Sequence, residues 1–343
     1  MRVLAGDIGG TKTAVAIVEA DARRLTPKQQ RVYPSADYES LDKILVEFLD
    51  GVERIPPVAC FGVAGPVVAG KATVTKLPWT IDERALTRAL GIPTVRVIND
   101  FVAAAAGLSY LRPRQLRRLS AGEPESRGPI ALIGAGTGLG QAGLIWAGRH
   151  YVPLPSEGGH ADLAARDARE DRLIGFLRER VGRVTRDRVL SGGGLAQIYD
   201  FLKEDRFAPE RAAVARAFAR EDKAAVISRL ALARRDRLSQ EALRMFLSIY
   251  GSEAGNLALQ YRATGGVYVG GGIATRILPA FRTSEFLDSF VRKPPMESLL
   301  ARVPIHIVAD PSLGLLGAAA SAYWTMTEMT RFSSRMSVRF RRR

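Results

Sequence analysis

The chain contains 343 residues, of which 47% are hydrophobic and 25% charged, and its formal net charge is +15. This length exceeds what one ordinary hydrophobic core fills, so two domains are predicted, and the composition excludes a fibrous or disordered chain. No apolar run is long enough to cross a membrane. The amino-terminal stretch MRVLAGDIGGTKTAVAIV lacks secretory architecture, because a glycine-rich turn interrupts its apolar segment. We expect a cytoplasmic protein without a membrane partner.

A single cysteine, Cys60, excludes an internal disulfide and a thiolate zinc cluster. We expect this cysteine to be buried as a small hydrophobic residue. Positive charge is concentrated at the carboxyl end, where residues 331–343 contain six arginines and no acidic residue. Such a tail either binds nucleic acid or an anionic surface, or is solvated and disordered. We favour disorder, because no nucleic-acid-binding motif accompanies the tail.

The first third of the chain alternates apolar strands with glycine-rich turns. We predict strands at residues 2–8, 14–20, 59–65 and 93–100. A second feature, GPVVAGKA at residues 65–72, matches the spacing of a P-loop, but Ala72 stands where a Mg²⁺-binding Ser or Thr belongs. Its proline and valines favour a strand or hairpin, so we exclude a Walker-type NTPase.

The rest of the chain repeats this plan around a helical segment. Residues 128–148, GPIALIGAGTGLGQAGLIWAG, again predict strand, glycine-rich turn and strand. Residues 265–278 predict a strand, a glycine turn and the start of a helix. Residues 303–324 predict a strand, an acidic turn and an alanine-rich helix. A helical insertion with solvated charged faces is expected over residues 211–259.

Because one plan recurs, we predict two similar α/β halves that face a cleft. The last helix, at about residues 313–325, is expected to pack back onto the first half and to make that domain discontinuous. The predicted parts are a small α/β domain at 1–109 plus 310–330, a large α/β domain with the helical insertion at 110–309, and a basic, disordered tail at 331–343.

Asn99 and Asp100 end one predicted strand, in VINDFVAAAAG, where an alanine-rich helix begins. Both residue types cap helix N-termini, because their side chains accept hydrogen bonds from the first free N–H groups. The alternative is a ligand site, since ligands bind beyond the carboxyl ends of strands in open α/β sheets. From these residues alone both interpretations stay open.

Three glycine-rich turns are candidates for binding phosphate or a nucleotide. The turn from Asp7 to Thr11 would present backbone N–H groups to an anion while Asp7 holds a hydrated Mg²⁺; a tight β-hairpin is the alternative. The second turn, GAGTGLG at residues 134–140, does not match the dinucleotide-binding fingerprint G-x-G-x-x-G, because Leu139 stands where the third glycine belongs and a strand follows the turn. We therefore exclude a Rossmann oxidoreductase. Gly270-Gly271-Gly272 would let a flat ring such as adenine approach the backbone; an ordinary strand-to-helix turn is the alternative.

Taken in order, seven segments resemble bacterial-type glucokinases of the hexokinase–actin–Hsp70 ATPase superfamily. They are GDIGGTKT, FGVAGPV, VINDFVAAAAG, GAGTGLG, SEGGHAD, RVLSGGG and GGVYVGGGI. The similarity runs from about Val3 to Trp324. The zinc-containing repressor/ORF/kinase branch is excluded, because its cysteine-rich motif is impossible with one cysteine. The resemblance implies an α/β fold of two ribonuclease-H-like, actin-type ATPase domains with an interdomain cleft. It also implies ATP and Mg²⁺ as cofactors, glucose as substrate and a homodimer.

The resemblance also implies site residues. Asp100 is the implied catalytic base, and the implied sugar ligands are Asn99, Asp100, Glu157, His160 and Asp187. Asp187 stands where the family usually has Glu, so sugar affinity is the property most affected. The implied nucleotide-binding residues are Gly6, Asp7, Ile8, Gly9, Gly10, Thr11, Gly136, Thr137, Gly138, Gly271 and Gly272, and Asp7 would hold Mg²⁺ through water. The family's usual Asn in the stretch TKLPW is replaced by Lys76.

Histidine is rare in this chain, with residues 150, 160 and 306 as its three positions, and their spacing suggests no metal triad. A histidine beside a carboxylate is commonly structural or part of a surface pair. His160 follows two glycines, with Glu157 three residues before it, and this arrangement better suits a sugar-binding loop.

The predicted function is ATP-dependent phosphorylation of D-glucose at the 6-hydroxyl, feeding glycolysis, with Asp100 as general base. One alternative is a kinase for a related hexose such as mannose or glucosamine, motivated by Asp187. Another is a sugar-sensing binding protein without turnover, with its basic tail on nucleic acid. The presence of Asp100, Asp7 and both phosphate-type turns argues against the sensor, and nucleic acid is not expected as a partner.

Overall fold

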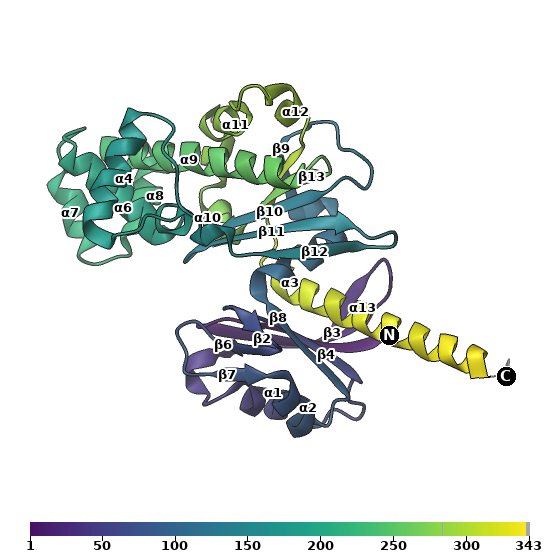
Figure 1. The fold of residues 1–343 in the computed structure, drawn as a ribbon. Coiled ribbons are helices and arrows are strands. Elements are labelled where there is room, and N and C mark those ends of the chain that lie inside the picture. Colours follow the sequence, from purple (N-terminus) through teal and green to yellow (C-terminus); the bar gives the residue numbers. More distant parts are fainter. Residues whose placement is uncertain (283, 341–343) are drawn as a thin grey trace. The chain divides into compact units, whose positions relative to one another are not determined.

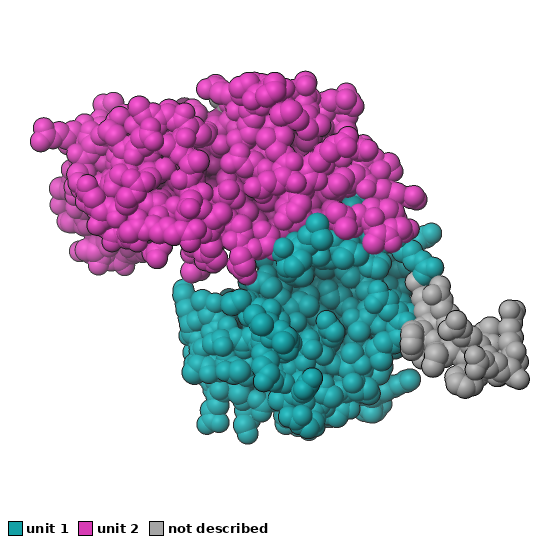
Figure 2. All heavy atoms as spheres, viewed as in Figure 1, with its two compact units in different colours: residues 1–112, 149–155, 310–343 teal, residues 113–148, 156–309 magenta. Residues whose placement is uncertain are grey.

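The computed structural model describes residues 1–282 and 284–340, drawn as a ribbon in Figure 1. The chain divides into two compact units, coloured separately in Figure 2. Unit 1 comprises residues 1–112, 149–155 and the chain from 310 onward, and unit 2 comprises 113–148 and 156–309. The expected division differs from these units in that it ended the first segment at 109 and placed segment 149–155 in the second domain.

Unit 1 contains a five-stranded sheet in the order β3-β2-β1-β4-β8. Its strands are β1 (Arg2–Ile8), β2 (Lys12–Ala20), β3 (Leu25–Pro34), β4 (Val58–Val63) and β8 (Thr94–Asn99). The central strand, β1, pairs antiparallel with β2 across the GGTKT turn and parallel with β4, which in turn pairs parallel with β8. The carboxyl ends of β1, β4 and β8 therefore meet at one edge, where the Asp7 turn and Asn99 lie.

A six-stranded sheet in the order β12-β11-β10-β13-β14-β9 lies in unit 2 except for β12, most of whose residues group with unit 1. Its strands are β9 (Leu116–Ser120), β10 (Ile130–Ala135), β11 (Leu139–Trp146), β12 (Tyr151–Ser156), β13 (Gly266–Gly270) and β14 (Ile305–Val308). Strand β10 again forms a hairpin with its successor, and β13 and β14 follow in parallel. The first five strands thus repeat the strand order of the unit 1 sheet, and the four strands β11, β10, β13 and β14 also repeat its strand directions, which supports the duplicated plan.

The stretch at 65–72 is a β-hairpin, as predicted, and not a phosphate-binding loop. Strands β5 (Val67–Val68) and β6 (Lys71–Thr73) pair antiparallel, and β7 (Thr80–Asp82) completes a small three-stranded sheet. The two residues at the hairpin turn, Ala69 and Gly70, both have positive φ, of 50° and 74°. Two consecutive positive φ values are the signature of a tight hairpin turn.

The helices of unit 1 are α1 (Leu41–Leu49), α2 (Glu83–Leu90), α3 (Asp100–Gly107) and α13 (Leu313–Phe340). Helix α13 returns to the first half of the chain and packs on α3, β1 and β4, as expected (Figure 1). The two helix backbones approach closely: a Cβ added at Gly317 would lie 1.5 Å from the carbonyl oxygen of Ala103. Only small residues fit such a crossing, which explains the alanine-rich sequence after Asp100.

Helix α13 is longer than expected. The predicted end was near Thr325 with a disordered tail at 331–343, whereas the helix continues to Phe340. The physical reason is helix cooperativity: once a helix is nucleated by packing, each further residue adds a hydrogen bond without a new nucleation cost. Residues 341–343, the end of the predicted tail, lie outside the described residues.

The helical insertion of unit 2 is present as predicted. The helices of this unit are α4 (Ala168–Val181), α5 (Arg186–Val189), α6 (Gly192–Glu204), α7 (Ala212–Phe218), α8 (Lys223–Leu232), α9 (Arg237–Tyr261), α10 (Gly271–Arg276), α11 (Ser284–Val291) and α12 (Glu297–Ala301). Helix α9 has buried residues along most of its length and packs against α6, α8, α11 and β10. It therefore forms the centre of the unit 2 core.

Cys60 is fully buried on β4, as expected, and burial raises the pKa of its thiol to about 12. A thiol with such a pKa stays protonated and unreactive at neutral pH. In the part of the chain that the structure describes, no helix is both long and apolar enough to cross a membrane.

Candidate active site

The first phosphate-type turn, which follows Asp7 and connects β1 and β2, is held by two hydrogen bonds from Ser35. The Ser35 hydroxyl is buried and donates to the Gly9 carbonyl at 2.8 Å, and the Ser35 N–H donates to the Thr11 carbonyl at 3.1 Å. Gly10 must be glycine, because a Cβ there would lie 2.4 Å from the Thr75 carbonyl oxygen. The turn is a tight hairpin, and its backbone shape is held by groups distant in sequence.

Three of the predicted nucleotide-binding residues, Gly6, Asp7 and Ile8, lie in β1 and not in the turn, with Asp7 and Ile8 at its carboxyl end. Their backbones take part in ladders with both β2 and β4, and Ile8 is fully buried in the unit 1 core. Lys76, the departure from the family pattern, has a φ of 70°. Asparagine adopts this left-handed conformation more readily than lysine does, which is the local consequence of the replacement.

Asn99 caps helix α3. Its side-chain oxygen accepts from the N–H groups of Phe101 at 2.9 Å and Val102 at 3.2 Å. Its amide nitrogen donates to the Gly65 carbonyl at 3.1 Å, linking the cap to the loop after β4. The cap interpretation of Asn99 is therefore confirmed, while its role as a sugar ligand stays a prediction.

Asp7 and Asp100 form a pair of neighbouring carboxylates in unit 1. Burial, and secondly the negative charge of Asp100, raise the pKa of Asp7 from 3.8 to about 6. Asp100 lies in the first turn of α3, where the Phe101 N–H donates to its Oδ1 at 2.9 Å. A Cβ added at Gly314, at the start of α13, would lie 2.7 Å from Oδ2 of Asp7, so glycine leaves room for this carboxylate.

Such a pair fits a divalent cation. Two carboxylates that repel one another, one of them largely buried, gain most from a hard cation that takes oxygen ligands and keeps several waters. Within the described residues, no three His, Cys, Asp or Glu side chains are grouped to hold a metal ion by themselves. This donor set therefore suits Mg²⁺ that is also bound by waters and by a phosphate ligand.

Unit 2 brings three of the predicted sugar ligands together. The loop after β12 contains the 3-10 turn η4 (Gly158–His160), and Asp187 lies in the first turn of α5. His160 Nδ1 lies 3.7 Å from Asp187 Oδ1, and His160 Nε2 lies 3.9 Å from Glu157 Oε2. Glu157 and His160 are exposed, whereas the Asp187 side chain is 21% exposed and accepts a hydrogen bond from the Thr185 hydroxyl.

A cavity of about 580 Å³ opens beside this cluster, within unit 2. Its lining includes His160 and Asp187 of the predicted sugar site, Thr137 of the second phosphate-type turn, and Ser191 at the N-terminus of α6. Two predicted sugar ligands and one predicted nucleotide-binding residue of this unit therefore line one cavity. The lining does not include Glu157, Gly136, Gly138, Gly271 or Gly272. The ligand roles of all these residues stay predictions. Asp7, Asn99 and Asp100 belong to unit 1.

The second turn and the triple glycine have clear local roles. The Gly136 carbonyl accepts from the Gly192 N–H at 3.0 Å, which ties the turn to the start of α6. Gly271 has a φ of 86°, and a Cβ there would lie 2.3 Å from the Ala135 carbonyl oxygen. A Cβ at Gly272 would meet no atom within 4 Å. A strand-to-helix turn thus explains Gly271 and leaves Gly272 open to a ligand; nucleotide binding here stays a prediction.

Gly159 makes the closest backbone approach in the loop that is predicted to bind sugar, because a Cβ there would lie 2.0 Å from the Leu139 carbonyl oxygen. We expect Gly159→Ala to displace Glu157 and His160 and to raise the sugar KM about tenfold, the factor that corresponds to about 1.4 kcal/mol. Steady-state kinetics checks this, with Gly175→Ala as control because a Cβ at Gly175 meets nothing within 4 Å. An unchanged KM in Gly159→Ala would show that the loop moves without cost.

Sequence reasoning missed Ser35 and Gly314. Ser35 contacts Gly9 from 26 residues away, and Gly314 faces Asp7 from the opposite end of the chain. Neither stands in a motif, so no local signal marks either residue. Only the folded sheet and the return of α13 reveal that both shape the turn around Asp7.

The actin-like ATPase fold is defined here by two sheets of the same strand order, each containing a hairpin, with glycine turns at the ends of β1 and β10. Among proteins of this fold, the chain is a sugar kinase. A family model described as Glucokinase matches residues 4–324. The chain belongs to the glucokinase family and is a phosphotransferase, which confirms the resemblance seen in its motifs.

Individual relatives support the same assignment. The glucokinase of Nostoc punctiforme is 44% identical over 335 residues, which cover 93% of this chain and 98% of that protein. The crystal structure of a glucokinase from an Antarctic psychrotroph has a TM-score of 0.83 at 33% identity, covering 94% of this chain and 98% of its own. A ROK family glucokinase from Streptomyces griseus, in complex with glucose and AMPPNP, has a TM-score of 0.63 at 20% identity, with 94% and 100% covered, and shares the fold.

Proposed function

We propose that this protein transfers the γ-phosphoryl group of ATP to the 6-hydroxyl of D-glucose, yielding glucose 6-phosphate and ADP. The observation that carries the proposal is the Asp7–Asp100 carboxylate pair at the carboxyl ends of β1 and β8, beside a phosphate-type turn. Membership of the glucokinase family supports glucose as the substrate. ATP, Mg²⁺, a cytoplasmic location, a place in glycolysis and a homodimer belong to the same proposal.

In the proposed mechanism, Asp100 accepts the proton of the sugar 6-hydroxyl as its oxygen attacks the γ-phosphorus. The sugar hydroxyl is a weak nucleophile until a base accepts its proton. Removing a general base lowers the rate by about 10²–10⁴-fold. Asn99, capping α3, fixes the backbone that presents Asp100. Glu157, His160 and Asp187 bind sugar hydroxyls, and the N–H groups of the glycine turns bind phosphate oxygens. Asp7 would hold a hydrated Mg²⁺, and the bound cation would supply neutralisation of the phosphate charge.

The test is coupled detection of sugar phosphate with Mg-ATP across a panel of glucose, mannose and glucosamine. Formation of glucose 6-phosphate, with the highest kcat/KM for glucose, is expected. A preference for another hexose would keep the reaction and change the substrate. No product from any sugar, in protein that remains folded, would overturn the proposal and favour a sugar sensor or another phosphoryl donor.

Asp187 is the observation that keeps a related hexose as a second candidate. Its carboxylate accepts from Thr185 and faces His160, and it is one methylene shorter than the family's usual glutamate. We expect Asp187→Glu to lower the KM for glucose severalfold, because the longer side chain reaches the sugar without a bridging water. Kinetics with glucose and mannose checks this. An unchanged KM for glucose would mean that the loop already accommodates aspartate.

A further inference from the structure

Glu253 is a buried carboxylate on α9 that none of the chemistry above uses. Its side chain is 3% exposed, and three donors from different elements bind it. Arg186 Nη1 and Gln141 Nε2 each lie 2.8 Å from Oε1, and Asn256 Nδ2 lies 3.1 Å from Oε2. Buried carboxylates are rare unless they are paired and hydrogen-bonded, so this group holds Arg186 and Gln141 strongly in place.

Both partners of Glu253 lead to the predicted sugar ligands. Arg186 immediately precedes Asp187 in the first turn of α5, and its guanidinium also donates to the Gly158 carbonyl at 3.4 Å. Gln141, on β11, is 1% exposed and packs against the Glu157–His160 loop, because a Cβ at Gly158 would lie 2.2 Å from the Gln141 side-chain oxygen. One carboxylate therefore supports the Glu157–His160 loop from two sides and supports Asp187 through the adjacent residue.

We propose that Glu253 is a positioning residue for sugar binding, acting through Arg186 and Gln141 to fix the distance between the Glu157–His160 loop and Asp187. The inference deepens the proposed function and rests on its assignment of these ligands. Glu253 itself is buried and does not line the cavity beside His160 and Asp187. A sugar is recognised by several fixed donors and acceptors at once, so a small relative shift of two segments weakens all of their hydrogen bonds together.

Backbone contacts already join the two segments, which limits the size of the effect. The Arg186 N–H donates to the Ala161 carbonyl at 3.0 Å, and the Leu163 N–H donates to the Val184 carbonyl at 3.1 Å. Without Glu253 the segments therefore remain neighbours, but the Arg186 charge lies buried without its partner. We expect a loss of precision in the sugar site while the fold is retained.

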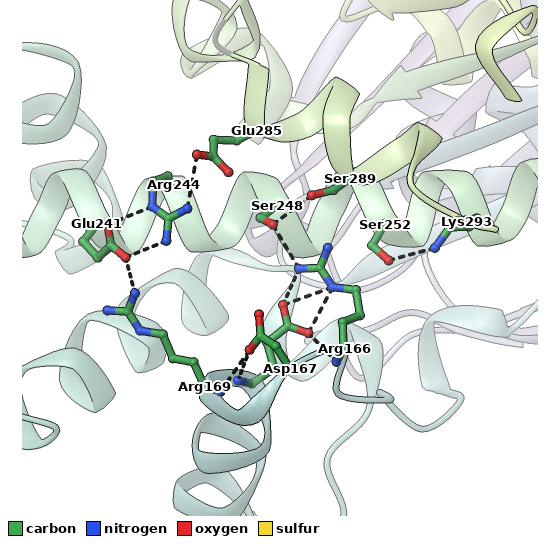
Figure 3. Close-up of polar contacts among 11 residues, drawn as sticks. Arg166, Asp167, Arg169, Glu241, Arg244, Ser248, Ser252, Glu285, Ser289 and Lys293 are labelled. Atoms are coloured by element: carbon green, nitrogen blue, oxygen red, sulfur yellow. Dashed lines mark hydrogen bonds and ion pairs between the residues drawn. The ribbon is translucent and has the colours of Figure 1, made fainter. Parts of the chain in front are cut away.

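The same helix supplies a matched control. Glu241 is also a largely buried carboxylate on α9, 12% exposed, and it binds Arg169 and Arg244 (Figure 3). Arg244 in turn binds Glu285 of α11 at 3.2 Å. None of these residues belongs to the sugar-binding segments or lines the cavity beside them. Glu241→Gln thus removes a comparable carboxylate–arginine cluster from the same element.

The experiment compares Glu253→Gln with Glu241→Gln and wild type in steady-state kinetics with glucose and Mg-ATP. For Glu253→Gln we expect the KM for glucose to rise about tenfold, the factor for one lost charge-assisted hydrogen bond, with kcat within about threefold and the KM for ATP unchanged. Glu241→Gln is expected to keep the KM of wild type. Equal KM changes in both variants, or none in Glu253→Gln, would overturn the inference and leave the proposed function standing.

Hydrogen exchange gives a second readout that needs no activity. Faster amide exchange is expected in residues 157–163 and 184–191 of Glu253→Gln and not in Glu241→Gln, because only the first variant loosens these segments. If wild type makes no sugar phosphate, the proposed function fails, and exchange still decides whether Glu253 holds the two segments. If Glu253→Gln does not fold, the shorter Glu253→Asp is used, and unchanged exchange there would contradict the inference.

Discussion

Replacing Asp100 with alanine is expected to lower kcat for glucose phosphorylation by about 10²–10⁴-fold while sugar binding remains. The carboxylate is the proposed proton acceptor, and a methyl group cannot take its place. Asn99 keeps its two hydrogen bonds to the first turn of α3, so the helix still has its cap. Coupled kinetics measures turnover, and calorimetric titration with glucose measures binding.

Loss of a helix-end carboxylate needs its own control, because Asp100 also accepts from the Phe101 N–H. Asp82 caps α2 by accepting from the N–H groups of Arg84 at 2.8 Å and Ala85 at 3.0 Å, and it has no proposed role in chemistry. Asp82→Ala is expected to lower stability slightly, because α2 loses its cap, and to retain turnover. Near-normal turnover in Asp100→Ala would remove Asp100 from the role of base.

The second large effect concerns Asp7, whose replacement by asparagine is expected to lower activity at least about 100-fold and yet to stabilise the metal-free protein at pH 8. Activity falls because the amide holds Mg²⁺ far more weakly than a carboxylate does, and neutralising the phosphate charge is a main part of phosphoryl transfer. Stability rises because the ionised Asp7 is largely buried and repelled by the charge of Asp100. An uncharged amide avoids both the cost of burying a charge and this repulsion.

The sign of the pH dependence follows from the raised pKa of Asp7. Its pKa in the folded protein, about 6, exceeds its ordinary value of 3.8, so the folded state binds the proton more tightly. This contribution to stability is fully present below about pH 4 and is lost as the pH rises through 6. Two pKa units correspond to about 3 kcal/mol, which partial exposure of the carboxylate reduces to about 1–2 kcal/mol.

Thermal unfolding in EDTA without nucleotide, at pH values from 4 to 8, measures this contribution as the difference in Tm between Asp7→Asn and wild type. We expect the variant to be more stable at pH 8 and the difference to vanish near pH 4. A difference that is constant over this range would show that titration of Asp7 is not its cause. Retained activity in Asp7→Asn would exclude its proposed role toward Mg²⁺.

Much of the fold was predictable because its signals are local. Apolar runs interrupted by glycines predicted the β1–β2 and β10–β11 hairpins, and the proline and valines of residues 65–72 predicted the β5–β6 hairpin. The place of Asn99 between a strand and an alanine-rich helix left a cap and a ligand site both open, and the structure confirms the cap. The extent of α13 was not predictable in this way, because the packing that nucleates the helix involves α3 and β1.

The candidate site likewise has some features that local sequence predicts and others that only tertiary packing determines. By itself, the sequence indicated the order of strands and turns and the duplicated plan, because backbone preferences act over a few residues. Asp7 stood out through its glycine-rich turn, whereas Asp100 as base and Glu157, His160 and Asp187 as sugar ligands came from the resemblance of whole motifs to the glucokinase family. Only the tertiary structure decided that Ser35 braces the Gly9 turn from 26 residues away and that Glu253 binds Gln141 from 112 residues away. It also decided that Asp7 is buried enough to raise its pKa. Burial and long-range contact are properties of packed surfaces, and no local stretch of sequence specifies which surfaces will meet.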